Sequence, residues 1–354
     1  MLINKNKRQM KTRVNIRDIA KAAGVSIASV SRSLKGPSPY LSEKRRKMIL
    51  DVCAEMHYYP NEHARRMFSR MASSVAMFYP SFSVDYKDAP RHLLDVNFGT
   101  CLLGTQSILE KHGIALVLVG LTQEYIEKKS HLKLCRGKSV DGILIWGAWE
   151  SQKDYITELL QEDFSPVLLQ TEINDLPCAR VIADDAAGTS FLVRKLLDSG
   201  HCRIAVAAPP THASTGRERM HGILAAFQET GTQPYFISTE ADYGYQFGIR
   251  CAEEILKRCS PLPDAIVCSN DNAAFGCIAY LKEHGLKIPE DISVVGADGF
   301  PTRGELTVES FATPAYEIGQ KGAELLLDQI AGAKHFPRVI LPVKPVHGNT
   351  FRQR

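Results

Sequence analysis

The sequence predicts two parts: an N-terminal three-helix helix-turn-helix module, and a larger two-lobed α/β domain whose lobes are two doubly wound parallel sheets. Three observations lead to this prediction. Apolar residues follow helical spacing through the first 60 residues, short apolar strands alternate with amphipathic stretches beyond residue 73, and that alternation runs through two successive series. A chain of 354 residues with 44% hydrophobic residues can fill two or three domains.

The net charge divides the chain at Ser73. Residues 1–73 hold 16 Lys and Arg against 5 Asp and Glu, whereas residues 74–354 hold 27 against 34. A strongly basic segment on an acidic body indicates that one end meets a polyanion, either a nucleic acid or an anionic membrane. The start of the chain is polar and no apolar run can span a bilayer, which argues against the membrane. We therefore expect a cytoplasmic protein without a membrane partner.

Motifs for catalysis, metal binding and disulfides are missing from the sequence. The nine cysteines are scattered without any C-x-x-C pair, which predicts reduced thiols and neither a disulfide framework nor a zinc site. G-x-S-x-G, Walker, G-x-G-x-x-G and H-E-x-x-H motifs are also absent. We therefore expect a protein that is not an enzyme and that binds no cofactor and no metal.

The N-terminal segment predicts three helices. The first begins after Asn15, which is placed to cap it, and stops at Gly24. Ser26 can cap a second helix over residues 27–34, which completes a helix-turn-helix arrangement. Ser42 can cap a third helix with one apolar stripe, formed by Ile49, Val52, Cys53 and Met56. Residues 61–67 can form about two more helical turns, too short to persist alone, so we expect them to fold with a partner.

The rest of the chain predicts βαβ units. The expected strands are 75–79, 114–119, 143–146 and 167–169, then a strand near 181, then 204–208, 235–237, 265–268 and 292–295. The expected helices are 98–111 and those beginning near 188, 217, 244, 272 and 314. Ligands of open α/β sheets bind outside the carboxyl ends of the strands. The polar candidates there are Asp184, Asn270, Asp271, Asp298 and the region 79–82.

The run from Val14 to Arg32, V-N-I-R-D-I-A-K-A-A-G-V-S-I-A-S-V-S-R, resembles the N-terminal signature of the lactose/galactose repressor (LacI/GalR) family. Further motifs agree along the chain: Tyr59-Pro60-Asn61, Ser199-Gly200-His201, Ser269-Asn270-Asp271 and the run from Pro289 to Gly296. The resemblance implies a homodimer in which each subunit reads half of a palindromic operator. It also implies a periplasmic-binding-protein-like core that binds a small effector between its lobes and alters the affinity for DNA.

The resemblance also implies domain bounds. Residues 1–60 form the DNA-binding domain with a basic N-terminal arm, 61–73 the hinge helix and linker, and 74–354 the effector-binding and dimerisation domain. Lobe 1 is expected to comprise about 74–175 and 306–333, and lobe 2 about 176–305 and 334–354. No apolar heptads occur near the end of the sequence, so a dimer is expected rather than a coiled-coil tetramer.

For the DNA end, the resemblance assigns the reading positions of the second helix, in the major groove, to Ile27, Ala28 and Arg32. Ile27 and Ala28 can only contact thymine methyl groups, whereas Arg32 can form two hydrogen bonds to guanine. Alternatively, Ile27 is a core residue and Arg32 a solvated surface charge. The other expected DNA contacts are Arg17, Ser26, Ser29, Ser31, Asn61, Arg65 and Met67.

Met67 occupies the position at which the family inserts a Leu into the minor groove. Methionine is apolar and flexible enough to enter a base step, although it is less rigid than Leu. The alternative is that Met67 faces the core.

For the sensing end, the resemblance implies that Arg219, Asn270 and Asp298 line the effector cleft and that Tyr243 offers a ring face. This combination suits a neutral polyhydroxylated ligand such as a sugar. The alternatives are a turn cap for Asp298, a helix cap for Asn270 and a surface charge for Arg219. Tyr79 and Gln170 complete the set from the first lobe. The sequences around them depart from the family pattern, which lets that lobe recognise an unusual ligand.

The function expected from these features is a sequence-specific DNA-binding transcription regulator, most simply a repressor, controlled by a small effector. The alternative is a solute-binding or sensor protein without operator-specific DNA binding. Such a protein shares the two-lobed core, but solute binding does not account for an excess of 11 positive charges over residues 1–73.

Overall fold

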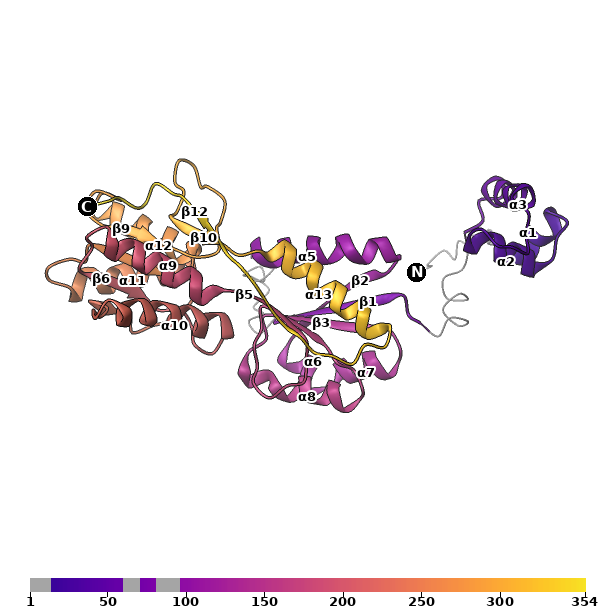
Figure 1. The fold of residues 1–354 in the computed structure, drawn as a ribbon, viewed down its shortest axis with the longest axis horizontal. Coiled ribbons are helices and arrows are strands. Elements are labelled where there is room, and N and C mark those ends of the chain that lie inside the picture. The colour runs from indigo at the N-terminus through magenta and orange to yellow at the C-terminus, as the bar shows by residue number, and fades with distance from the viewer. Residues whose placement is uncertain (1–13, 60–70, 81–95) are drawn as a thin grey trace, which may run out of the picture. The chain divides into compact units, whose positions relative to one another are not determined.

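The structure is a computed structural model that describes residues 14–59, 71–80 and 96–354 (Figure 1). It divides into two compact units, Met1–Met71 and Ala72–Arg354. The predicted hinge at 61–73 falls largely outside the described residues and stays a prediction. No helix in the described ranges is long and apolar enough to cross a membrane.

Over residues 14–59 the N-terminal unit is a three-helix bundle. Its helices are α1 (Ile16–Ala22), α2 (Ile27–Lys35) and α3 (Glu43–Glu55). The three predicted caps are confirmed: Asn15 forms a capping box with Asp18, Ser26 accepts from Ser29 N, and Ser42 accepts from Arg45 N. The buried core consists of Ile19, Ala20, Val30, Ile49 and Cys53. Polar caps thus fix where each helix begins, and a small apolar core fixes how the helices pack.

The first lobe of the second unit contains a six-stranded parallel sheet. In spatial order its strands are β11 (Arg338–Leu341), β5 (Arg180–Ala183), β4 (Val167–Leu169), β3 (Gly142–Trp146), β1 (Ser74–Pro80) and β2 (Ala115–Leu121). Strand β1 is buried on both faces, with Val75 and Met77 in one core cluster and Ala76 and Phe78 in the other. The sheet is therefore covered by helices on both sides, as its near-continuous apolar strands predict.

Helices α5 (Val96–Leu109) and α13 (Ala315–Ile330) cover one face of this sheet, and α6 (Gln123–Glu127), α7 (Ser130–Arg136) and α8 (Lys153–Gln161) lie on the other (Figure 1). Glycines let α5 and α13 approach closely: a Cβ on Gly104 would lie 2.0 Å from Tyr316 O, and one on Gly319 would lie 2.1 Å from Cys101 O. The contact therefore leaves no room for larger residues at these two positions.

The second lobe contains a four-stranded parallel sheet. Its strands, in order, are β7 (Phe236–Ile237), β6 (Ile204–Ala207), β8 (Ala265–Cys268) and β9 (Ser293–Val295). One face packs on α11 (Tyr245–Arg258) and α12 (Asp271–Glu283), and the other on α9 (Asp185–Asp198) and α10 (Ser214–Glu229). A short antiparallel ribbon, β10 (Ser310–Ala312) with β12 (Lys344–Val346), completes the lobe. Two doubly wound lobes are thus confirmed.

The expected bounds between the lobes need a correction. The expected second lobe includes residues 176–183 and 334–341, but β11 pairs with β5, and β5 pairs with β4, inside the first sheet. Residues 306–312 were assigned to the first lobe, but Glu309 and Phe311 accept backbone hydrogen bonds from Gly296 and Asp298 of the second. Periodicity locates a strand, but only long-range pairing decides which sheet it joins. In the described part of the chain, the backbone therefore crosses between the lobes three times, after β5, β10 and β11.

Candidate DNA-reading helix and effector site

One face of α2 is exposed in the N-terminal unit. Ile27 is 45% exposed, and Ala28 and Arg32 are also exposed, whereas Val30 and Ser33 point into the core. The alternative interpretation of Ile27 as a core residue is therefore wrong. The side chains at the three proposed reading positions share one solvent-facing surface.

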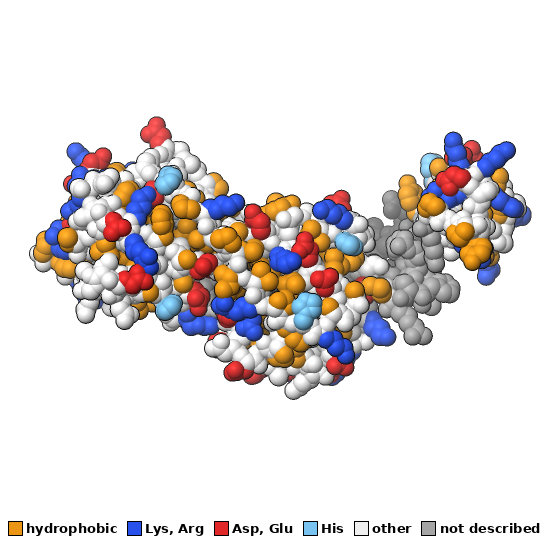
Figure 2. Space-filling view, in the orientation of Figure 1, with side chains coloured by type: hydrophobic (Ala, Val, Ile, Leu, Met, Phe, Trp, Pro, Cys, Tyr) orange, Lys and Arg blue, Asp and Glu red, His pale blue; other side chains and the backbone are white. Residues whose placement is uncertain are grey.

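Cations and serines surround this face. Arg17, Lys21 and Arg45 line an open hollow together with Ser26 and Ile27. Figure 2 shows Lys and Arg side chains over the surface of this unit. Ser26 and Ser29 lie 3.0 Å apart through their hydroxyl oxygens, and Ser31 is half-buried. These groups can donate to phosphate oxygens. The predicted contacts Asn61, Arg65 and Met67, and the basic arm, lie outside the described residues.

The two arginines beside the α2–α3 turn differ in their partners. Arg46 forms an ion pair with Glu43 at 3.1 Å and donates from Nε to Ser33 O at 3.2 Å. The guanidinium of Arg32 lies 5.8 Å from the centre of the Tyr40 ring and donates no hydrogen bond within the described residues. Arg32 therefore keeps its donors available for an external acceptor.

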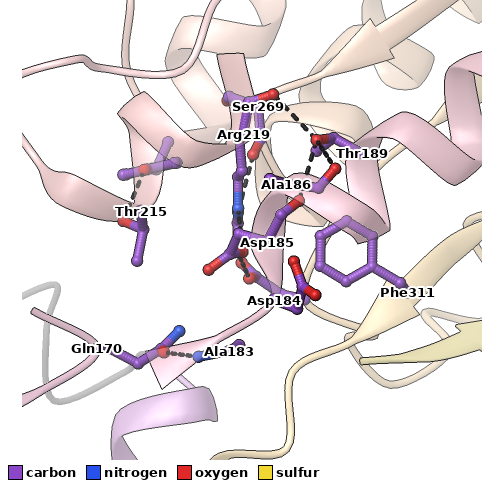
Figure 3. A network of polar contacts seen from close by, with 12 residues as sticks. Gln170, Ala183, Asp184, Asp185, Ala186, Thr189, Thr215, Arg219, Ser269 and Phe311 are labelled. Atoms are coloured by element: carbon purple, nitrogen blue, oxygen red, sulfur yellow. Dashed lines mark hydrogen bonds and ion pairs between the residues drawn. The ribbon is translucent and has the colours of Figure 1, made fainter. Parts of the chain in front are cut away.

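The centre of the second site is Arg219, on α10, whose side chain is 4% exposed. Its Nε lies 2.8 Å from Asp185 Oδ1, its Nη1 donates to Ser269 O at 2.9 Å, and its Nη2 lies 2.5 Å from Asp298 Oδ1. Figure 3 shows Arg219 between the start of α9, where Asp185 lies, and Ser269. The alternative interpretation of Arg219 as a surface charge is therefore wrong.

Two aromatic rings border this guanidinium. The ring centres of Tyr243 and Phe311 both lie 5.7 Å from its central carbon. The Tyr243 hydroxyl lies 3.1 Å from Thr215 Oγ1, which fixes the orientation of the ring. Burial raises the pKa of Tyr243 to about 12, so the phenol stays neutral and offers a donor and an apolar face.

Asp185 is a member of this network that sequence reasoning missed. Asp184, a polar candidate at a strand end, caps α9 by accepting from Ala187 N at 3.0 Å. Asp185 is buried and pairs with Arg219 instead. One carboxylate is enough to cap a helix. The second Asp of the Asp184-Asp185 pair was therefore the feature of the sequence that could have indicated a further role.

Burial disfavours the charged forms of the groups in this network, and ion pairing opposes that effect. Burial opposes ionisation of Arg219, but Asp185 and Asp298 outweigh it and raise the pKa of the guanidinium well above its usual value. Burial also raises the pKa of Asp185, and Arg219 opposes that shift. The neighbouring Asp271 is buried as well, and its pKa is raised by burial and by the charge of Asp298. The site thus holds more carboxylates than guanidinium groups.

Asn270 and Asp271 have structural tasks. The Asn270 side-chain oxygen caps α12 by accepting from Ala273 N at 2.9 Å, as its alternative interpretation predicted. Asp271 accepts from Phe300 N at 2.6 Å and from Ser310 Oγ at 2.7 Å. Asn270 lies one residue beyond Ser269, whose carbonyl binds Arg219. Its amide nitrogen remains as the group that can meet a ligand.

Two residues at strand ends adopt the left-handed backbone conformation that favours glycine. Asp298, after β9, has a φ of 103°, and Gln170, directly after β4, has a φ of 47°. The Asp298 backbone is held there by its N–H donating to Phe311 O at 2.9 Å. Strain of this kind costs roughly 1–3 kcal/mol and concentrates at functional sites. The strained backbone at Asp298 and Gln170 therefore indicates a functional site at the ends of these two strands.

The two first-lobe candidates, Gln170 and Tyr79, differ in their contacts with the site. Gln170 Oε1 accepts from Ala183 N at 2.6 Å (Figure 3). Burial raises the pKa of Asp185, and the Gln170 side chain adds a small effect that opposes this rise. The ring of Tyr79 packs on Phe98 at 5.2 Å, and no contact with Arg219 is recorded for it in the described chain. The residues that follow Tyr79 and Pro80 lie outside the described ranges.

The first turn of α10 is held by lobe 1. Glu172 N donates to Ser214 Oγ at 3.0 Å, and Arg217 Nη2 donates to Glu172 O at 3.0 Å. The rings of Trp149 and His212 also meet edge to face at 4.7 Å. Lobe 1 therefore contacts the turn of α10 that precedes the turn carrying Arg219.

Comparisons with known proteins match both units. The family described as "Bacterial regulatory proteins, lacI family" matches residues 15–61, and "Periplasmic binding proteins and sugar binding domain of LacI family" matches residues 77–348. The chain is 30% identical to the transcriptional repressor PurR of Pasteurella multocida, over 80% of this chain and 81% of that protein. It is 27% identical to the probable transcriptional repressor ExuR of Bacillus subtilis, over 90% of this chain and 92% of that protein.

A solved structure with the same fold is the lac repressor dimer bound to operator and the anti-inducer ONPF. Its TM-score is 0.80 at 24% identity, and the match covers 96% of this chain and 99% of that one.

Proposed function

Because the chain belongs to the LacI family of bacterial regulatory proteins, we propose that it represses transcription by binding a palindromic operator as a homodimer under the control of a small effector. The observation that carries the proposal is that one chain joins a helix-turn-helix with a free, cationic reading face to a two-lobed domain with a buried polar site. It acts in the cytoplasm, where its operator lies, and it needs no catalytic step.

At the DNA end, α2 enters the major groove. Arg32 binds guanine O6 and N7, and Ile27 and Ala28 contact thymine methyl groups. Phosphates are bound by Arg17, Ser26, Ser29 and Ser31, which fix the register without reading sequence. Asn61 and Arg65 contact the DNA near the minor groove, where Met67 of each subunit enters the central base step.

At the sensing end, the effector is a sugar or sugar derivative. Asp298 accepts from ligand hydroxyls, Arg219 donates its remaining N–H groups, and Tyr243 stacks against the apolar face of the ring. The amide nitrogen of Asn270 adds a donor, and Tyr79 closes the site from lobe 1. Gln170 acts through Asp185, because its side chain links the end of β4 to that carboxylate. Effector binding alters how the lobes meet at α10 and thereby the affinity for DNA.

The homodimer forms through the β2 edge of the first-lobe sheet, which has no further neighbouring strand within the described residues. Strand β2 is the last strand of its sheet and exposes Val117 and Leu118, and Leu103 on the neighbouring α5 is 66% exposed. An apolar edge strand in a single copy invites pairing with another chain. A second copy of this chain removes that surface from water and sets the two reading helices on one duplex.

Selection of bound duplexes from a random DNA pool tests the proposal, with and without a panel of neutral sugars and sugar derivatives. Recovery of a palindrome is expected from the full chain, and one of the panel should change the amount recovered. Residues 72–354 alone should bind the same compound and no DNA. Salt-sensitive binding without sequence preference would refute the operator-specific role and favour a solute sensor with a basic appendage.

A further inference from the structure

The contact between Arg32 and Tyr40 has no role in the function as proposed so far. Tyr40 follows α2 by five residues and is 80% exposed, and its ring lies 5.8 Å from the Arg32 guanidinium. The turn that carries it is defined: Ser38 and Leu41 form an antiparallel bridge, and Tyr40 N donates to Ser38 Oγ at 3.4 Å. Leu41 then packs against the core and anchors the turn.

We propose that Tyr40 is a positioning residue for sequence readout: its ring supports the face of the Arg32 guanidinium and holds the N–H edge toward a guanine. The inference rests on the proposed DNA-reading role of Arg32. A guanidinium is planar, so stacking occupies its face while the donors in its plane stay free for two hydrogen bonds to O6 and N7. A stack and a bidentate base contact therefore use different parts of the same group.

The arrangement also explains why Arg32 has an aromatic rather than an acidic neighbour. A carboxylate on Arg32, like that of Glu43 on Arg46, would occupy the donors and repel phosphate. A ring restrains the long side chain without consuming a donor or adding charge. The attraction is weak in water and strengthens when DNA excludes water from it. The ring thus acts most strongly in the complex.

The test measures base preference at the operator position where the full-length Arg32→Ala variant loses discrimination for guanine. Tyr40→Ala should lower the guanine preference there by about 2- to 30-fold, the range of a cation–π contact from exposed to desolvated. Tyr40→Phe keeps the ring and should stay within about twofold of the parent. In an Arg32→Ala background, Tyr40→Ala should have no further effect on preference. Thermal unfolding of each variant verifies the fold.

Tyr59→Ala is the matched control, because Tyr59 is equally exposed and lies outside the α2–α3 turn. Its guanine preference should equal that of the parent. The inference is overturned if Tyr40→Ala keeps the preference, weakens binding equally for all bases, or acts as strongly without Arg32. It is also overturned if Tyr40→Phe behaves like Tyr40→Ala, since the hydroxyl would then be the active group. If no operator is recovered, or Arg32→Ala changes no base preference, the proposed function itself fails.

Discussion

Arg32 and Arg219 show opposite uses of the same side chain in the two units. Arg32 lies on an exposed helix face and is supported only by a ring. Arg219 is buried, and its donors are directed to two carboxylates and a carbonyl. A charge kept free serves a partner that arrives from outside, whereas a charge neutralised within the fold holds the site together. Replacing the first should therefore change binding, and replacing the second should change stability.

The largest effect is expected for Arg219→Ala. This change leaves Asp185 and Asp298 buried without their partner, which should lower the free energy of unfolding by about 3–5 kcal/mol. Denaturant unfolding of the full chain measures it. Arg250→Ala is the control, because its ion pair with Glu240 is exposed and should contribute less than about 1 kcal/mol. Equal losses in the two variants would mean that the buried network does not support the lobe.

Arg32→Ala should change DNA binding and not stability, the converse of Arg219→Ala. Losing a bidentate guanine contact should lower operator discrimination by about 1–3 kcal/mol while leaving the free energy of unfolding unchanged. Competition binding against operators altered at one base pair measures the first quantity, and denaturant unfolding the second. A stability loss as large as that of Arg219→Ala would contradict the distinction between the two arginines.

The α/β unit should also respond to pH through His201. This buried ring donates from Nδ1 to Leu196 O and accepts at Nε2 from Ser293 Oγ. Burial lowers its pKa below the usual 6.5. The unfolded chain takes up a proton near pH 6.5 while the folded chain does not. Stability should therefore fall as the pH drops below that value, by at most about 1.4 kcal/mol per pH unit.

Denaturant unfolding of the parent and of His201→Asn between pH 7.5 and 5.5 separates this contribution, with the range chosen to span the usual pKa. The variant should show a shallower loss than the parent. A loss of equal slope in both proteins would assign the pH dependence to other groups, such as His131 of the first lobe, whose pKa is also lowered by burial.

The smallest effect is expected at Asn15. Its side chain accepts from Arg17 N at 2.9 Å and from Asp18 N at 3.3 Å, so Asn15→Ala should destabilise the N-terminal unit by about 1 kcal/mol. Hydrogen exchange of α1 amides detects the loss and leaves α9 and α10 as internal references. Equal loosening of both units would show that they do not unfold independently.

The sequence predicts local structure well and long-range choices poorly. The caps at Asn15, Ser26 and Ser42 are correct, because capping depends on residues within one turn. The lobe to which β5 and β11 belong was assigned wrongly, because their apolar patterns fit either sheet. The meeting of Arg219 and Asp298 was implied by the family resemblance, whereas Asp185 was missed because its role depends on a partner 34 residues away in the chain.

The three crossings between the lobes have a consequence for synthesis on the ribosome. The second-lobe sheet has all of its strands once Val295 has emerged. The first-lobe sheet, although it begins at Ser74, lacks β11 until residue 341 of 354. We expect the later lobe to reach its native pairing first, which reverses the usual order of folding from the N-terminus. If translation stalls between residues 295 and 341, the nascent chain exposes the unpaired edge of β5, which chaperones can cover.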